Sequence, residues 1–457
     1  MTRNGRGKSY EMDMCSGSIL GKMLLFALPL MFSSILQLLF NAADTIVVGK
    51  FAGDNSLAAV GSNGSLVNLL TNLFMGLSIG ANVLVARYYG AKQDEPLRKT
   101  IHTAMTVSAV SGVILALVGV IAARQLLTLM NSPAEVIDLA ALYLRIYFLG
   151  MPAMMVYNFG SAILRAVGDT KRPLYFLSIA GVINVVLNLV FVIVFKMDVA
   201  GVALATVISQ FISAVLVVRC MIKETGAIHL DVKELYVDKT TFLMILRIGL
   251  PASLQGIIFS ISNVIIQSSV NSFGAVVVAG NSAAANIEGF VYVAMNAFYQ
   301  AAISFESQNV GAGQYKRVNR IAVTAVGAAL VAGFTTGSLA VFFGRNLLTL
   351  YTSSPEVIEA GMRRLNVVAR TYALCGMMDA MVGVLRGLGY SVVPMIVSLL
   401  GACGLRLFWI FTFFRMEQFH TITSLYATYP ASWIITLTAH IISFIIIRRK
   451  LAKKWNA

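Results

Sequence analysis

Residues 28–49 read LPLMFSSILQLLFNAADTIVVG and contain a single charged side chain, Asp44. A run of about 20 predominantly apolar residues is long enough to cross the hydrocarbon core of a bilayer as one helix. Similar runs recur along the 457 residues, of which 58% are hydrophobic and only 12% are charged. Because so few charges cannot cover a water-soluble globule of this size, we expect lipid to surround much of the chain.

The apolar windows predict about twelve membrane-spanning helices. They lie near residues 23–49, 57–87, 101–123, 139–165, 173–195, 199–221, 242–272, 276–309, 321–344, 357–386, 392–415 and 423–447. A long polar segment divides them six and six, which predicts an N-terminal lobe (1–222), a cytoplasmic linker (223–241) and a C-terminal lobe (242–457). The predicted fold class is therefore an all-α integral membrane protein with two six-helix lobes.

The basic residues predict how the chain is oriented. Of the 35 Lys and Arg residues, 25 fall in the two terminal segments and the connections on one side of the membrane, and nine fall on the other side. Because cytoplasmic loops carry the excess of Lys and Arg, both termini are expected in the cytoplasm, with the chain in the plasma membrane. The net charge of +15 is spread over short loops, so we expect no nucleic-acid partner.

The two halves of the sequence resemble each other at a shift of 221 or 222 residues. Leu28-Pro29 recurs as Leu250-Pro251, and LLTL at 126–129 recurs at 347–350. Fixed spacing of this kind indicates an internal duplication. Since each half holds an even number of predicted spans, both halves enter the membrane from the same side. The repeat is then a parallel one, related by a pseudo-twofold axis along the membrane normal.

Polar residues in the predicted spans of the first half indicate an ion site. An ionisable side chain at the bilayer centre costs about 2.5–3.5 kcal/mol, so Asp44 is expected to hold a proton, a cation or a partner. Asn184 and Asn188 are four residues apart on one helix face, and Thr206 follows in the next span. Carboxylate, amide and hydroxyl oxygens suit a hard cation such as sodium. Hydrogen bonding between helices is the alternative role for these side chains.

The second half offers candidates for substrate binding. Glu288, Asp379 and Arg406 are ionisable residues within predicted spans, and they are accompanied by Tyr292, Asn296 and Tyr299. An ion pair between Glu288 and Arg406 is the structural alternative, and Asp379 fits a functional and a structural role equally well.

Several functional classes find no support in the sequence. It contains no GxxxxGK[ST] motif, so an ion gradient is the expected energy source. It contains no pattern of paired carboxylates, paired histidines or a serine beside a base, so we expect no enzymatic activity and no cofactor apart from a coupling proton or sodium ion. The four cysteines are scattered and suggest no disulfide or metal cluster.

These residues resemble the multidrug and toxic compound extrusion (MATE) transporters over nearly the whole chain. The shared motifs are the stretch at 28–49, LRAVGDTKRP at 164–173, QNVGAGQ at 308–314 and LRGLGYSVVP at 385–394. The resemblance implies export of small organic cations or amphipathic compounds in exchange for protons or sodium ions, by a chain that contacts membrane lipids and works as a monomer. A lipid-linked precursor flippase of the same superfamily is the alternative.

Within this family the chain looks similar to the branch of the DNA-damage-inducible F proteins. That branch implies a coupling site at Asp44, Asn184, position 188 and Thr206. Position 188 is Asn here, whereas the branch has Asp. The change removes one negative charge from the implied site and leaves open whether the coupling ion is a proton or sodium, and in what number.

Overall fold

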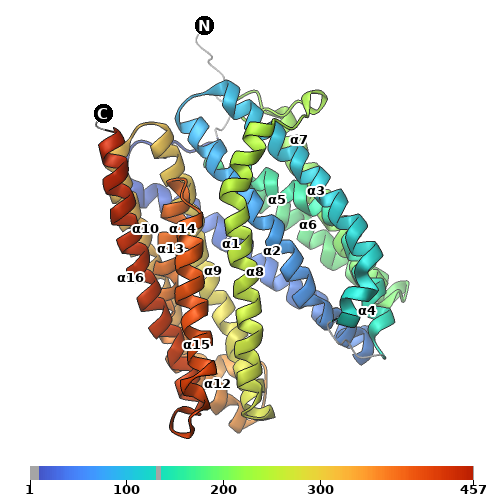
Figure 1. The fold of residues 1–457 in the computed structure, drawn as a ribbon. Coiled ribbons are helices and arrows are strands. Elements are labelled where there is room, and N and C mark those ends of the chain that lie inside the picture. The colour runs from blue at the N-terminus through green and yellow to red at the C-terminus, as the bar shows by residue number, and fades with distance from the viewer. Residues whose placement is uncertain (1–9, 130–134, 456–457) are drawn as a thin grey trace. The chain divides into compact units, whose positions relative to one another are not determined.

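The structure is a computed structural model that describes residues 10–129 and 135–455. Within these residues the regular elements are helices, as expected of a chain whose backbone polar groups must be satisfied without water. In chain order (Figure 1) they are α1 (Ile19–Phe51), α2 (Asp54–Gly90), α3 (Asp94–Leu129), α4 (Ile137–Leu149), α5 (Met151–Ala166), α6 (Lys171–Leu189), η1 (Val190–Val194), α7 (Asp198–Lys223), η2 (Val232–Glu234), α8 (Lys239–Asn271), α9 (Ala275–Gly311), α10 (Tyr315–Phe342), α11 (Gly344–Leu348), α12 (Pro355–Val367), η3 (Ala369–Thr371), α13 (Tyr372–Gly387), α14 (Val392–Ser398), η4 (Leu399–Gly404), α15 (Leu405–Phe411), η5 (Phe413–Arg415), η6 (Glu417–Phe419) and α16 (Ile422–Trp455).

The predicted all-helical membrane class is confirmed. In the described part of the chain, ten helical stretches are long and apolar enough to cross a membrane, or eleven if α4 and α5 form one bent span. The expected count was about twelve. The window near 57–87 does form a helix, α2, but α2 is not among these stretches.

The predicted span near 139–165 is broken. Its two parts, α4 and α5, meet at Gly150 with a bend of 48°. Pro152 stands in the first turn of α5, where its missing N–H removes a hydrogen bond that would otherwise continue α4. The proline therefore explains why one apolar window folds as two helices.

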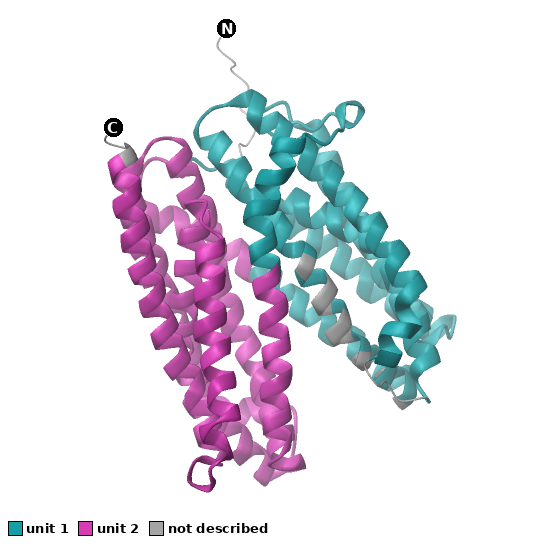
Figure 2. Ribbon diagram, viewed as in Figure 1, with its two compact units in different colours: residues 1–13, 32–253 teal, residues 14–31, 254–457 magenta. Residues whose placement is uncertain are grey.

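The described residues form two compact units (Figure 2). Unit 1 comprises residues 1–13 and 32–253, and unit 2 comprises residues 14–31 and 254–457. The units differ from the two sequence halves in α1 and α8, each of which is divided between them. Both divisions fall between the second and third residues after a proline, Pro29 in α1 and Pro251 in α8. A proline inside a helix removes one backbone hydrogen bond, which loosens the helix at that point.

Small residues allow close helix packing inside unit 2. A Cβ atom added at Gly383 of α13 would lie 2.6 Å from the carbonyl oxygen of Tyr299 on α9. One added at Gly387 would lie 3.0 Å from the carbonyl oxygen of Ile303. Glycines at such positions bring membrane helices into backbone contact, and they hold α9 and α13 together.

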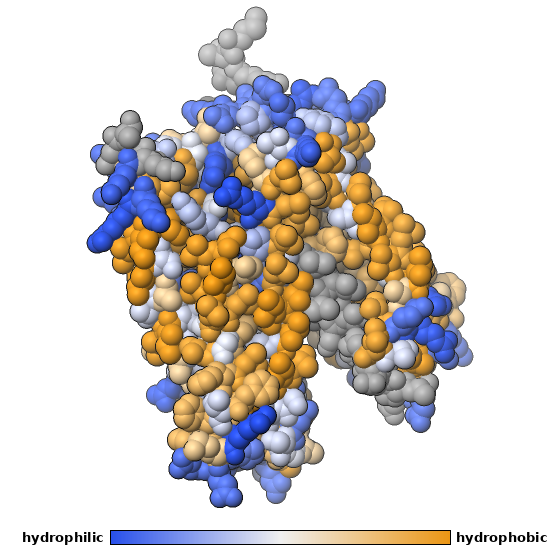
Figure 3. Space-filling model, in the orientation of Figure 1, coloured by the Kyte–Doolittle hydropathy of each residue, from blue (hydrophilic) through white to orange (hydrophobic). Residues whose placement is uncertain are grey.

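Each unit, taken by itself, has the surface of a membrane protein. Apolar side chains cover the middle of the helices and polar ones gather near the helix ends (Figure 3). Large apolar side chains are strongly exposed, with Phe342 at 80% and Val323 at 74%. Such a surface would be an aggregation liability in water, and lipid is the solvent that it fits.

The basic connections meet at one end of each unit. In unit 1, Tyr89 donates from its hydroxyl to Glu11 at 2.8 Å, Met12 N donates to Val167 O at 3.0 Å, and Asp231 N donates to His102 at 3.2 Å. These contacts join the N-terminal segment, two basic connections and the linker.

The same holds in unit 2. Arg317 donates to Gly17 O and Arg448 donates to Tyr315 O, both at 3.2 Å. The start of α10 therefore lies beside the N-terminal segment and the end of α16.

Candidate functional site

Three helices of unit 1 bring the four predicted ion-site residues together. Asp44 lies on α1, and Asn184 and Asn188 lie one turn apart on α6, so both amides face the same side. Asn188 Nδ2 donates to Asp44 Oδ1 and to Asn184 Oδ1, the latter at 3.3 Å. Asn184 Nδ2 donates to Thr206 Oγ1 of α7 at 3.4 Å. The residues selected from sequence spacing thus form one hydrogen-bonded chain.

The oxygens of this chain are suited to a hard cation. Asn188 is 1% exposed, and its Oδ1 atom has no hydrogen-bond partner among the described residues. A buried amide oxygen without a donor carries a desolvation cost of about 1–3 kcal/mol, which a bound cation or water would offset. Thr206 Oγ1 donates to Val202 O at 3.0 Å and accepts from Asn184, so one of its two lone pairs remains available. With the Asp44 carboxylate, these atoms form the all-oxygen donor set that sodium prefers.

The helix changes its winding directly after the site. α6 ends at Leu189, one residue past Asn188, and continues as the π-helical segment η1. Phe195 N donates to Val190 O at 3.1 Å, a hydrogen bond that spans five residues. π-Helical turns within α-helices are frequent at functional sites, because the extra residue redirects the side chains around it.

Asp44, Asn184 and Thr206 line a cavity of about 630 Å³ inside unit 1. Asp44 is the one charged residue among its described lining residues. Two tyrosines of α4, Tyr143 and Tyr147, stack on its wall with ring centroids 6.0 Å apart. The other aromatic, thioether and amide residues in its lining are Gln37, Phe40, Asn41, Asn63, Met75, Met154, Tyr157, Asn158 and Gln210. Aromatic and apolar walls interspersed with amide and hydroxyl groups, together with one carboxylate, can accommodate a drug-sized cation.

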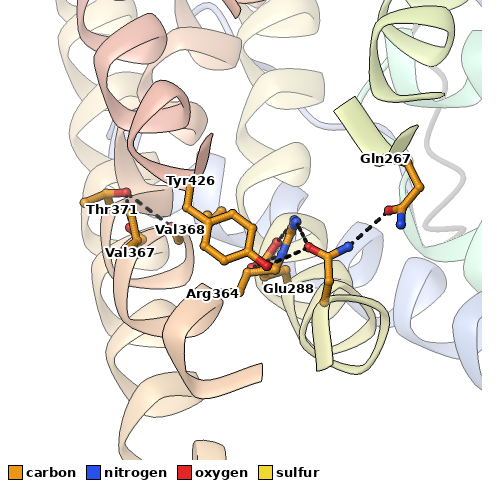
Figure 4. A network of polar contacts seen from close by, with 8 residues as sticks. Gln267, Glu288, Arg364, Val367, Val368, Thr371 and Tyr426 are labelled. Atoms are coloured by element: carbon orange, nitrogen blue, oxygen red, sulfur yellow. Dashed lines mark hydrogen bonds and ion pairs between the residues drawn. The ribbon is translucent and has the colours of Figure 1, made fainter. Parts of the chain in front are cut away.

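Glu288, the acid predicted to contact substrate, is in a buried ion pair of unit 2. Arg364 Nε donates to Glu288 Oε1 at 3.0 Å, and Arg364 Nη2 donates to Glu288 Oε2 at 2.7 Å. Arg364 Nη1 reaches Asn281 Oδ1 at 2.7 Å, and Asn281 also contacts Tyr426 and Gln267 (Figure 4). The partner of Glu288 is therefore Arg364 and not Arg406, which was the sequence alternative.

Arg364 does not stand out in the sequence, because it lies beside Arg363 near the start of the predicted span at 357–386, where basic residues of a connection are also expected. It lies on α12 and is only 8% exposed. Its neighbours along the buried face of this short amphipathic helix are Ala360, Gly361 and Leu365. The helical spacing of these small and apolar residues is the signal that would have placed Arg364 on the inner face.

Arg406 sits among aromatic rings. Its guanidinium carbon lies 4.2 Å from the ring centre of Tyr429 and 5.5 Å from that of Trp433. Its Nε donates to Ser432 Oγ at 2.9 Å. Cation–π contacts stabilise a positive charge without an acid, which explains how Arg406 is accommodated away from Glu288.

The remaining candidates of unit 2 lie on α9 and α13. Tyr299 accepts a hydrogen bond from Arg386, which also donates to Gln255 Oε1 at 2.8 Å. Asn296 Nδ2 donates to the Tyr292 hydroxyl at 3.1 Å. Asp379 lies half-buried on α13, and its carboxyl group shares a side-chain hydrogen bond with Tyr292. The described hydrogen bonds and ion pairs do not join the six residues predicted for substrate binding into one cluster, in contrast to the four at Asp44.

Comparison with known proteins identifies the family. The MatE family model matches residues 29–190 and again residues 251–412, two matches that begin 222 residues apart and repeat the shift seen in the sequence. The probable multidrug resistance protein YoeA of Bacillus subtilis is 28% identical over 427 residues, covering 92% of each chain. The probable multidrug resistance protein NorM of Thermotoga maritima is 24% identical, covering 84% of each chain.

Solved structures agree with this assignment in fold. An outward-facing multidrug resistance MATE family transporter of the MOP superfamily superposes with a TM-score of 0.87 at 22% identity, over 97% of this chain and 98% of that one. The resemblance expected from the motifs is confirmed. This chain belongs to the MatE family, and it is a multi-pass membrane transporter rather than an enzyme.

Proposed function

We propose that this chain is a secondary active antiporter that exports amphipathic organic cations in exchange for protons or sodium ions. The observation that carries the proposal is the cavity of unit 1, where Asp44 is the one charge among the described lining residues and is held by Asn188. The relatives named above as multidrug resistance proteins support the export direction. The basic connections support a plasma-membrane location with cytoplasmic termini.

Competition between the coupling ion and the organic cation for the Asp44 carboxylate would couple their movements across the membrane. A proton or sodium ion neutralises Asp44, and an organic cation is attracted to the cavity when that charge is free. A ligand shifts a conformational equilibrium only by its different affinity for the two states, so each cation must favour one access state of the cavity. For sodium, the Asn188 side chain would turn its unpartnered Oδ1 toward the ion.

The aromatic walls would select the shape of the exported compound. Tyr143 and Tyr147 offer π faces within the cavity, and a cation above such a face gains about 0.5–2 kcal/mol. The apolar surface beside them fits planar, lipophilic cations more readily than small hydrated ones.

Dye efflux from proteoliposomes tests the proposal. The purified chain is reconstituted and ethidium efflux is recorded under a pH gradient alone and under a sodium gradient alone. We expect one gradient or both to drive efflux, and Asp44→Asn to abolish it. Glu95→Gln is the matched control, because Glu95 is an exposed acid paired with Lys99 outside the cavity. If Asp44→Asn exports as well as the parent under both gradients, the proposal is wrong.

A further inference from the structure

Glu306 is a buried acid that the sequence analysis did not single out. It lies on α9, five residues before the end of that helix at Gly311, and it is 0% exposed. Neither of its carboxylate oxygens has a hydrogen-bond partner among the described residues. Glu288 on the same helix shows the usual alternative, a two-fold hydrogen bond to Arg364.

An ionised carboxylate cannot be kept in such a place at low cost. Burial of a charge without a partner costs several kcal/mol after relaxation, and a buried acid avoids this cost by holding its proton. We propose that Glu306 is a second proton-binding site of this transporter, located in unit 2 and loaded in the conformation described here. Its proton is separate from the ion bound at Asp44.

The charged groups around Glu306 are engaged elsewhere. Gly387 of α13 lies directly against its Cβ atom, and the adjacent Arg386 turns to Tyr299 and Gln255. On α10, Arg317 donates to Asn309 and Gly17, and on α1, Lys22 donates to Ser16. On α16, His440 forms a hydrogen bond with Ser398, and Arg448 donates to Asn319 and Tyr315.

Arg448 attracts the Glu306 carboxyl group electrostatically, but the ion pairs of the described residues do not include one between the two. The proton on Glu306 therefore takes the place of a counter-charge.

The internal repeat shows that packing alone does not require an acid here. With Gly311 aligned to Gly90, the position equivalent to Glu306 in the first half is Val85, which is also 0% exposed. A buried valine fills that place in unit 1 without any polar group. The carboxyl group of Glu306 is thus an addition to the duplicated fold.

The location gives the proton a short route of exchange. Gln308 and Asn309 follow Glu306 and contact Met14 of the N-terminal segment, at the end of unit 2 where Arg317 and Arg448 also lie. A small separation of α9 from α13 at Gly387 would expose the carboxyl group to water at that end. Ionisation is then favourable, so loss of the proton would accompany that separation.

Infrared spectroscopy of the reconstituted full-length chain tests the site without any transport substrate. A protonated carboxyl group gives a carbonyl band that shifts in deuterated water and that an ionised carboxylate lacks. We expect the wild type to show this band at neutral pH, Glu306→Gln to lose the Glu306 component, and Glu95→Gln, which removes an exposed acid, to leave it in place. An unchanged band in Glu306→Gln overturns the proposal. If Glu306→Gln does not fold, Glu306→Val provides the same comparison with the residue that occupies position 85.

A transport measurement tests this inference separately from the proposed function. The effect of Glu306 on transport rests on the proposed function, whereas the proton site itself does not. We expect Glu306→Gln to retain ethidium efflux but to carry fewer protons per dye molecule and to flatten the dependence of efflux on pH. If Glu306→Gln loses the infrared component while Asp44→Asn still exports ethidium, the antiport proposal is refuted and the proton site stands. An unchanged proton count in Glu306→Gln contradicts a role of this proton in transport.

Discussion

The side-chain amide of Asn188 donates a hydrogen bond to Asp44 Oδ1, joining α6 to α1 inside unit 1. A neutral amide therefore stands where the related branch is expected to carry a second acid. Asn188 orients the carboxylate without adding charge, and its own oxygen remains without a partner among the described residues. If a cation binds here as we propose, its affinity would rest on one negative charge and on neutral oxygens.

The first prediction concerns that missing charge. Asn188→Asp places two carboxylates in direct contact, and two such groups cannot both ionise unless a cation lies between them. We expect the variant to gain sodium dependence, with ethidium efflux rising at least severalfold on addition of sodium. Asn188→Ala, which removes the hydrogen bond without adding charge, should show no such gain. A sodium response in Asn188→Asp equal to that of the parent would contradict this account of the site.

The second prediction concerns Thr206. Thr206→Val removes the hydroxyl group that accepts from Asn184, and one such hydrogen bond contributes about 1 kcal/mol. Apparent affinity for the coupling ion should fall roughly fivefold, measured as the ion concentration for half-maximal efflux. Thr206→Ser keeps the hydroxyl group and should stay near the parent value. Equal affinities for Thr206→Val and Thr206→Ser would show that this oxygen is not a ligand.

The third prediction separates structure from substrate binding at Glu288. Glu288→Gln leaves Arg364 buried without its counter-charge, which should lower the free energy of unfolding by about 3–5 kcal/mol. The double variant Glu288→Leu with Arg364→Met should recover most of this loss, measured by thermal unfolding in detergent. Glu359→Gln is the exposed control, because its pair with Arg345 is more than half exposed and contributes about 0–1 kcal/mol.

Transport by the double variant then decides the role of the pair. If the folded Glu288→Leu, Arg364→Met protein exports ethidium like the parent, the pair is structural. Loss of export despite recovered stability would assign Glu288 to the substrate, as the sequence suggested.

The fourth prediction concerns the contact between α9 and α13. Gly383→Ala would put a methyl group 2.6 Å from the Tyr299 carbonyl oxygen, so the helices must separate. Overpacking of this kind costs about 1–3 kcal/mol, and the melting temperature should fall. Gly289→Ala is the control on α9, since its added carbon meets nothing within 4 Å and should be neutral or stabilising by about 0.5–1 kcal/mol. Equal melting temperatures would show that the close approach is not needed.

The sequence predicted the helical class and the Asp44 cluster for physical reasons. Apolar run length determines whether a helix can cross a bilayer, and the spacing of Asn184 and Asn188 places both on one face of α6. Contacts between distant helices left weaker signals. Arg364 has no local mark of burial, because it follows another arginine on a short helix. Glu306 has none either, because the absence of a partner from other helices cannot be read from its own segment.

The sequence pattern also did not predict which residues make up each unit. The duplication marks equal halves, and the polar segment 223–241 suggested a boundary there. The part of a helix that follows its proline can pack in a different unit from the part before it. The apolar periodicity of the sequence does not show in which unit each part packs. The repeated prolines, Pro29 and Pro251, were the local sign of that exchange.

That division of α1 and α8 bears on how the chain arose. Residues 14–31 of the first half belong to unit 2, and residues 239–253 of the second half belong to unit 1, so each bundle is completed by a segment borrowed from the other repeat. A half-length ancestor would have completed its bundle only by exchanging this segment with a second copy, as a domain-swapped homodimer. Gene fusion would then have made the swap permanent. Neither half cut at the linker should fold alone, whereas two halves produced together can restore the exchange.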